Sequence, residues 1–202
     1  AAAARQSTIV TATMNPNPPA LSTSIRLARR PVGLPVAEDW SIVSEPAPMP
    51  AEGEVLVRTS LISLDPAMRG WMNEGKSYIP PVGLGEVMRA GGIGVVVASK
   101  NTAFKAGDFV SAGTGVQEYA LFAADQVKRS GMFKIDTRLG TPSQWLNVLG
   151  MPGMTAYVGL LDVGQAKAGD TLVVSGAAGA VGQTVGQLGK IKIIAFDEDP
   201  IT

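Results

Sequence analysis

The stretch from Thr171 to Gly182 constrains the fold more than any other part of the chain, because an apolar run breaks there into closely spaced glycines. Its sequence is TLVVSGAAGAVG. The β-branched residues favour a strand, and the glycines predict a tight turn followed by a helix. Glycines let a turn backbone approach a pyrophosphate, and the N–H groups at a helix start attract its charge. The stretch predicts a dinucleotide-binding turn, although close packing of a helix on a strand also selects glycine.

The chain contains neither cysteine nor histidine. This excludes disulfides, thiolate nucleophiles, histidine bases and zinc sites with sulfur or imidazole ligands, so no metal site is predicted. Seventeen basic residues balance seventeen acidic ones, which argues against a nucleic-acid partner. With 46% hydrophobic residues and no apolar run of the roughly 20 residues that a bilayer requires, we expect a soluble protein without membrane contact.

Composition and patterning divide the chain into three segments. Residues 1–24 are rich in Ala, Ser, Thr, Asn and Pro, which predicts a flexible extension. We expect a cytoplasmic protein, or an organellar one if this extension is a processed targeting remnant. In residues 25–140, short β-type runs alternate with turn glycines and predict a largely β domain; the runs are Val55–Ile62, Ile93–Ala98, Phe109–Val110 and Gln117–Ala123.

Residues 141–202 have the pattern of part of a nucleotide-binding domain. Apolar residues at three- and four-residue spacings predict two short helices interrupted at Met151-Pro152-Gly153, before the strand at Thr171. A β domain followed by helix, strand, glycine turn and helix predicts a two-domain α/β protein with its cofactor at the junction. The residues after Gly182 are too few to complete a nucleotide-binding domain, so this domain is expected to be truncated.

Three groups of residues carry a family resemblance. They are LGMPGMTAY at 149–157, the stretch 164–182, and the motifs LDPAMRG, KSYIPP and LGEVM between Leu64 and Met88. Together, over about Ile25 to Lys192, they resemble the zinc-independent medium-chain dehydrogenases/reductases. Within that superfamily they are similar to the alkenal double-bond reductases, a group that includes prostaglandin and leukotriene reductases and bacterial curcumin reductase. The resemblance implies a GroES-like β domain plus a truncated Rossmann-type nucleotide-binding domain.

The resemblance also implies a reaction and its residues. NADPH would deliver a hydride to the β-carbon of a small α,β-unsaturated aldehyde or ketone. The residues implied to lie under the cofactor phosphates are Gly179, Ala180, Val181 and Gly182, and those nearer the nicotinamide are Met151, Pro152, Gly153 and Thr155. Tyr78 would face the substrate and orient it, as the candidate catalytic residue.

Several of these residues have a structural alternative. Tyr78, which lies before two prolines, is also typical of a packing residue with a solvated hydroxyl. Thr155 is also a candidate N-cap of the helix that it would begin. Arg69 and Lys76 are candidates for contacting a phosphate or an enolate, and equally for being solvated loop cations.

Two departures from the family pattern affect the interpretation. Position 67 is Ala where the motif usually carries Tyr, so the polarity of the substrate stays open. In the first of two interpretations of the C-terminal residues, a helix from Ala180 to Leu188 leads into a second strand from Lys190 to Phe196. Asp197 would then hydrogen-bond a ribose 2′-OH of the cofactor and favour NADH over NADPH. In the second, residues 190–202 are the family's closing strand, which returns to the GroES-like domain.

Three functions follow from these alternatives. The first is NADPH-dependent reduction of the C=C bond of enals and enones, for which a homodimer is possible. The second is a catalytically inactive, reductase-like fragment that acts as a structural or interaction subunit of a larger assembly, since a short chain would fix little of the cofactor. The third is an NADPH quinone reductase of the same superfamily.

Overall fold

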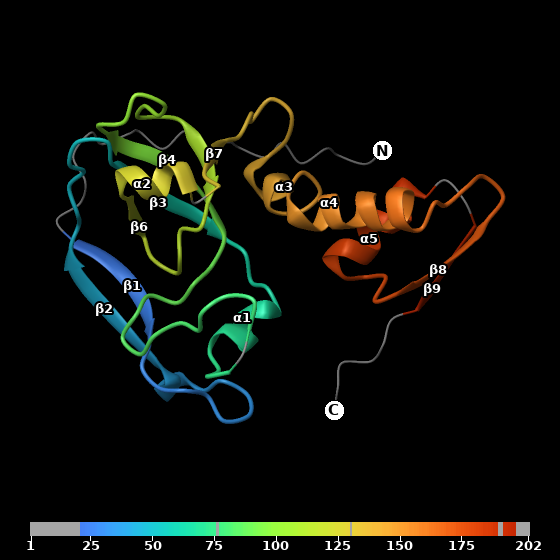
Figure 1. The fold of residues 1–202 in the computed structure, drawn as a ribbon, viewed down its shortest axis with the longest axis horizontal. Helices are drawn as coiled ribbons and strands as arrows, with labels where there is room; N and C mark the ends of the chain where they lie inside the picture. Colours follow the sequence, from blue (N-terminus) through green and yellow to red (C-terminus); the bar gives the residue numbers. More distant parts are fainter. Residues whose placement is uncertain (1–20, 76, 130, 190–191, 197–202) are drawn as a thin grey trace, which may run out of the picture.

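The computed structural model describes residues 21–75, 77–129, 131–189 and 192–196, and its first element is a β-hairpin (Figure 1). Strand β1 (Leu21–Leu27) pairs antiparallel with β2 (Trp40–Pro46). A short 3-10 helix, Ala37–Asp39, precedes β2. Residues 21–24, which we expected in the flexible extension, instead form the first half of β1, because their backbone is in register with the end of β2. Residues 1–20 lie outside the described part of the chain.

A five-stranded antiparallel sheet forms the body of the β domain, in the order β6-β3-β4-β5-β7. Its strands are β3 (Val55–Ile62), β4 (Gly92–Ser99), β5 (Phe109–Ala112), β6 (Tyr119–Phe122) and β7 (Phe133–Lys134). Two short helices, α1 (Ala67–Trp71) and α2 (Ala124–Arg129), lie in the connections. A strand is present at each run that the sequence predicted, and β3 has the predicted bounds.

Strand β1 joins the hairpin to the rest of the domain through its second edge. Residues 23–25 pair with the segment that leads into β6, where the Ile25 N–H donates to the Val116 carbonyl at 2.9 Å. Farther along the same edge, the Met88 N–H donates to the Ile25 carbonyl at 2.9 Å. β1 is therefore hydrogen-bonded on both edges, to β2 on one side and to the segments around Met88 and Val116 on the other, which ties the hairpin to the rest of the domain.

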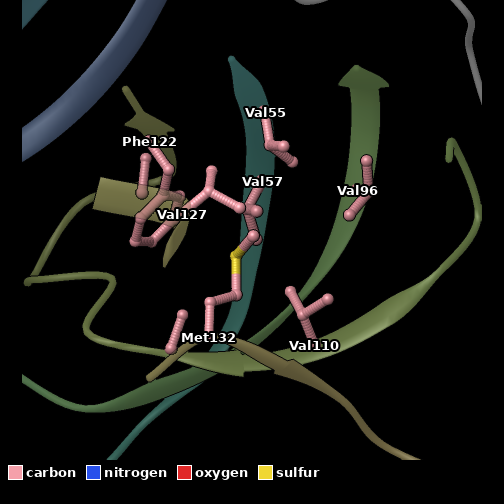
Figure 2. Packing of buried hydrophobic residues seen from close by; sticks show 9 residues of the cluster. Val55, Val57, Val96, Val110, Phe122, Val127 and Met132 are labelled. Carbon is pink, nitrogen blue, oxygen red and sulfur yellow. The ribbon is translucent and has the colours of Figure 1, made fainter. Parts of the chain in front are cut away.

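The main core lies between β3, β4, β5, β6 and the α2 segment (Figure 2). Its labelled members are Val55, Val57, Val96, Val110, Phe122, Val127 and Met132. A second buried cluster consists of Leu27, Met72, Val82 and Met88, with Trp71 packed against it. Because this second cluster joins β1 to α1, it fixes the end of α1 from which the candidate substrate residue Tyr78 follows.

The remaining elements form a smaller α/β region. It comprises α3 (Pro142–Leu146), α4 (Met151–Tyr157), a π-helical turn (Val158–Val163), β8 (Thr171–Ser175), α5 (Ala180–Leu188) and β9 (Lys192–Phe196). β8 and β9 pair in parallel, with Thr171 opposite Lys192 and Ser175 opposite Phe196. The interpretation of residues 190–202 as a strand that returns to the β domain is therefore wrong for β9. Helix α5 supplies the crossover that parallel pairing requires. Asp197 lies outside the described residues.

The α/β region exposes many apolar side chains. Met151, Met154, Tyr157, Val163 and Val173 are all more than half exposed, whereas Ala156, Leu160 and Val174 are buried. Parallel sheets normally have both faces covered, so the described part of this region has a small core for its type of fold. None of the described helices is long and apolar enough to span a membrane.

Candidate functional site

The turn between β8 and α5 contains the glycines that the sequence singled out. Gly176 has a φ of 61°, in the left-handed region that favours glycine, and the Gly179 N–H donates to its carbonyl at 3.0 Å. Gly179 is the N-cap of α5 and contributes no capping side chain. The N–H groups of Ala180, Val181 and Gly182 lie in the first helical turn, where backbone donors have no intrahelical acceptor and the helix dipole is positive. This end of α5 can bind an anionic group such as a phosphate.

Gly179 and Gly182 lie in different surroundings. A Cβ atom at Gly182 would lie 2.3 Å from the Gly176 carbonyl oxygen and 2.9 Å from the Ala177 Cα. A Cβ atom at Gly179 would meet only the Gly176 carbonyl oxygen, at 3.1 Å. Gly182 therefore lets α5 pack closely on the turn, whereas Gly179 keeps the space beyond the helix end free of a side chain.

Met151, Pro152 and Gly153 form the first turn of α4 rather than the interruption that we predicted there. Pro152 stands at a first-turn position, where its missing N–H costs no hydrogen bond, so it begins this helix instead of breaking it. A Cβ atom at Gly153 would lie 1.8 Å from the Val148 carbonyl oxygen, so this glycine is required by close backbone packing. The interruption falls at residues 147–150, between α3 and α4.

Thr155 lies inside α4, and the prediction that it caps this helix is wrong. Its hydroxyl donates to the Met151 carbonyl at 2.8 Å, one turn back, while Gly150 occupies the N-cap position. The side chain of Thr155 is exposed. Because α4 packs against α5 (Figure 1), Thr155 and residues 151–153 share a helix pair with the glycine turn at 179–182.

Tyr78 lies at the surface of the β domain, with 80% of the residue exposed, so it is not an interior packing residue. Its hydroxyl accepts a hydrogen bond from the Trp71 indole N–H at 3.2 Å. The guanidinium carbon of Arg89 lies 5.5 Å from the centroid of the Trp71 ring, and Arg89 Nη1 donates to the Pro80 carbonyl at 3.1 Å. We call Trp71, Tyr78 and Arg89 the aromatic cluster.

Sequence reasoning missed Trp71 and Arg89. The cluster forms because residues that follow α1 fold back onto its last residue, and no periodic pattern in the sequence predicts that. One clue was available, since the N–H of a partly buried indole needs an acceptor and a tyrosine hydroxyl follows seven positions later.

The Arg69 guanidinium donates hydrogen bonds within the protein and is not directed at a phosphate or an enolate. Its Nη2 and Nε donate to the Gly33 carbonyl at 2.9 and 3.2 Å, and its Nη1 donates to Asn73 Oδ1 at 2.6 Å. Asp39 follows the same loop, which lies around Gly33, and accepts a hydrogen bond from Arg29 Nε at 2.5 Å. The Arg29 hydrogen bond, with a second from a backbone N–H, holds the pKa of Asp39 below its ordinary value. Arg69 is thus a structural clamp on the loop around Gly33.

Asp65 and Glu86, the acidic residues of the LDPAMRG and LGEVM motifs, have local hydrogen-bond partners. Asp65 accepts from the Ser63 hydroxyl at 2.9 Å, and Glu86 accepts from the Gly83 N–H at 2.8 Å, so neither carboxylate is engaged with the other. Lys76 lies outside the described residues. The described ranges contain no group of three carboxylate, imidazole or thiol side chains placed to hold a metal ion.

Comparison with known proteins relates this geometry to a family. Residues 23–130 match the family model of the N-terminal domain of oxidoreductase. A putative NADP-dependent oxidoreductase of Bacillus subtilis is 50% identical over 168 residues, 83% of this chain and 48% of its own. The NADPH-dependent curcumin reductase of Escherichia coli is 47% identical over 166 residues, 82% of this chain and 47% of its own.

Solved structures agree with the sequence relatives. The crystal structure of CurA from Vibrio vulnificus in complex with NADPH has a TM-score of 0.78 at 45% identity, covering 88% of this chain and 52% of that one. The chain spans about half the length of the relatives that it matches. The match confirms the predicted α/β fold class, with a GroES-like β domain and part of a Rossmann-type domain. The chain therefore belongs to the zinc-independent medium-chain dehydrogenase/reductase superfamily and carries the N-terminal domain of oxidoreductase at residues 23–130.

Proposed function

We propose that this chain supplies the substrate-side domain and the cofactor-phosphate turn of an NADPH-dependent reductase, one that reduces the C=C bond of α,β-unsaturated aldehydes and ketones. The observation that carries the proposal is the β8-to-α5 turn, where the first helical N–H groups open onto a space that Gly179 leaves free of a side chain. The names of the relatives, NADP-dependent oxidoreductase and NADPH-dependent curcumin reductase, support the same cofactor and reaction class.

The residues at the turn fit the phosphates of NADPH. The backbone of residues 179–182 offers N–H donors and the positive end of α5, and no acidic side chain stands in that first turn to repel a phosphate. On family resemblance, residues 151–153 and Thr155 lie nearer the nicotinamide. When bound, the cofactor supplies the hydride for the β-carbon of the substrate.

On the substrate side, Tyr78 is the residue that we assign to the carbonyl group. Its exposed hydroxyl can donate a hydrogen bond to a carbonyl oxygen, and that bond strengthens as negative charge develops on the oxygen during reduction. Ala67 begins α1, four positions before Trp71, so the two side chains occupy neighbouring positions on one helical face. A small residue at position 67 leaves room there for a bulky or apolar substrate.

Nucleotide titration tests the cofactor half of the proposal. Nucleotide fluorescence should show saturable binding of NADPH to the chain. We expect the binding to be lost in Gly179→Val, because the new side chain fills the space over the helix end. Gly159→Val is the matched control, since a Cβ atom there meets nothing within 4 Å. Equal NADPH affinity in wild type and Gly179→Val would contradict the assignment of the turn.

A hybrid enzyme tests the reaction. Residues 21–189 would replace the matching half of the Escherichia coli curcumin reductase, and NADPH oxidation would be followed with an enal, an enone and a quinone. We expect turnover of the enal and the enone, weakened by Tyr78→Phe. Turnover of the quinone alone would favour a quinone reductase, whereas a hybrid that binds NADPH but reduces none of the three would favour an interaction subunit.

A further inference from the structure

We propose that Trp71 is a positioning residue that turns the Tyr78 hydroxyl into a hydrogen-bond donor for the substrate carbonyl, with the Arg89 guanidinium over the Trp71 ring reinforcing it. The inference rests on the proposed function and deepens it, because it names what fixes the direction of the Tyr78 hydrogen bond. It depends on three contacts of the aromatic cluster: Trp71 with Tyr78, Arg89 with Trp71, and Arg89 with Pro80.

The chemistry of the two groups fixes the direction of the first contact. An indole N–H can only donate, so in the 3.2 Å contact the Tyr78 oxygen is the acceptor. A tyrosine hydroxyl carries one proton of its own, which this contact does not use. Within the described ranges, no hydrogen bond from Tyr78 to a protein acceptor is formed. With 80% of the residue exposed, the proton is available to an acceptor on a bound ligand.

The cluster also holds the tyrosine in place. Trp71 is half-buried against the cluster of Leu27, Met72, Val82 and Met88, so its ring is a fixed support. Arg89 donates to the Pro80 carbonyl at 3.1 Å, two residues after Tyr78, while its guanidinium lies over the Trp71 ring. An exposed tyrosine otherwise loses rotamer freedom when it binds a ligand, and a hydroxyl that is already oriented avoids part of that loss.

The positive charge of Arg89 strengthens the donor chain. A cation over an indole face attracts the electron density of the ring, which makes the N–H a stronger donor. Hydrogen bonds in a chain polarise one another, so a stronger Trp71 donor makes the Tyr78 O–H a stronger donor in turn. The expected ligands are therefore molecules with a carbonyl acceptor, above hydrocarbons of the same shape.

Indole nitrogen NMR tests the contacts directly, on the full chain and without any activity assay. The chain has three tryptophans, and Trp145 donates its own indole N–H to the Asp136 carbonyl at 3.2 Å, which makes its signal an internal control. We expect Tyr78→Phe to shift the Trp71 indole N–H signal and leave that of Trp145 unchanged. Arg89→Gln should also shift the Trp71 signal, and Arg89→Lys should restore part of it. An unmoved Trp71 signal in Tyr78→Phe would overturn the proposal.

Ligand discrimination tests the role. The probes are 4-phenylbut-3-en-2-one and 1-phenyl-1-butene, which lacks the carbonyl, with affinities measured by ligand-observed NMR. Loss of one net hydrogen bond lowers the preference for the carbonyl probe about fivefold. We expect this loss in Tyr78→Phe and in Trp71→Phe. The double variant should lose no more than either single variant, because both substitutions remove the same interaction. Trp145→Phe, which removes an indole donor outside the aromatic cluster, should keep the wild-type preference.

The outcomes separate the two proposals. If wild type prefers neither probe, the substrate side of the proposed function fails, and the donor role fails with it. If Tyr78→Phe loses the preference but Trp71→Phe keeps it, the proposed function stands and the positioning role is overturned. If Trp71→Phe weakens both probes equally, the tryptophan supports the local fold and does not direct the hydroxyl, which also overturns the proposal.

Discussion

Replacing Gly182 or Gly179 with alanine separates the two functions that a glycine-rich turn can serve. The two positions lie three residues apart at the start of one helix, and each substitution adds a single methyl group. At Gly182 that methyl group would lie 2.3 Å from the Gly176 carbonyl oxygen and 2.9 Å from the Ala177 Cα, both of them backbone atoms. At Gly179 its only neighbour within 4 Å would be the same oxygen, at 3.1 Å.

The expected magnitudes follow from these distances. Overpacking typically costs about 1–3 kcal/mol, and an overlap with backbone, which cannot rotate away, belongs in the upper part of that range. Alanine returns about 0.5–1 kcal/mol of helix propensity inside α5. Gly182→Ala should therefore destabilise α5 by about 1–2 kcal/mol, a factor of about 5–30 in its opening equilibrium. At Gly179 a shift of a few tenths of an ångström relieves the contact, so the cost should stay below about 0.5 kcal/mol.

Native-state hydrogen exchange measures this difference locally, because it reports the opening of α5 separately from that of the β domain. We expect the amide protection of residues 184–188 to fall in Gly182→Ala and to stay near wild type in Gly179→Ala. On the proposed function, Gly179→Ala should nevertheless weaken binding in NADPH titrations, since its methyl group would stand where we propose that the cofactor phosphate approaches. Equal protection in the two variants, or a larger loss in Gly179→Ala, would refute the distinction.

Four further substitutions have defined outcomes. Arg69→Met removes the guanidinium that holds the loop around Gly33, so a thermal melt should show a loss of about 1–2 kcal/mol, and an unchanged melt would contradict the clamp. Leu56→Ala empties a fully buried position and should cost about 2–5 kcal/mol in urea denaturation, whereas Leu139→Ala, at a 72% exposed position, should cost less than about 0.5 kcal/mol. Hydrogen bonds from Arg138 hold the pKa of Asp136 at about 2. Because this folded value lies below the unfolded one, the pair stabilises the fold above about pH 4, and that stabilisation is lost as the pH falls through about 2. In Arg138→Gln the pKa of Asp136 should rise toward about 4 in an NMR titration, and a value that stays near 2 would contradict the assignment.

Local sequence was sufficient for most of the elements. Val55–Ile62 is a β-branched run bounded by turn residues, and its bounds match those of β3. The helix predicted from Ala180 to Leu188 matches α5, because Gly179 and Gly189 mark its two ends. The first turn of α4 was mispredicted because Pro152 was taken as a break, although proline is favoured at the start of a helix.

The arrangements that depend on distant contacts could not be predicted. Both interpretations of β9 were compatible with its sequence, and only its parallel pairing with β8 decides between them. Gly179 and Gly182 are indistinguishable in sequence, and their difference lies in where the Gly176 carbonyl points. The contact between Trp71 and Tyr78 requires the chain after α1 to fold back, which no local propensity encodes.

The double-edged bonding of β1 has a mechanical consequence. Tension applied along this strand loads its hydrogen bonds to β2 and those to residues 85–88 and 116–118 in shear, so that many must break at once. Forced unfolding is governed by the rate of crossing that barrier and not by the equilibrium free energy. Pulled from Leu21, the β domain should therefore resist extension and then yield in one abrupt step, whereas the two-stranded β8–β9 pair should give way at low force.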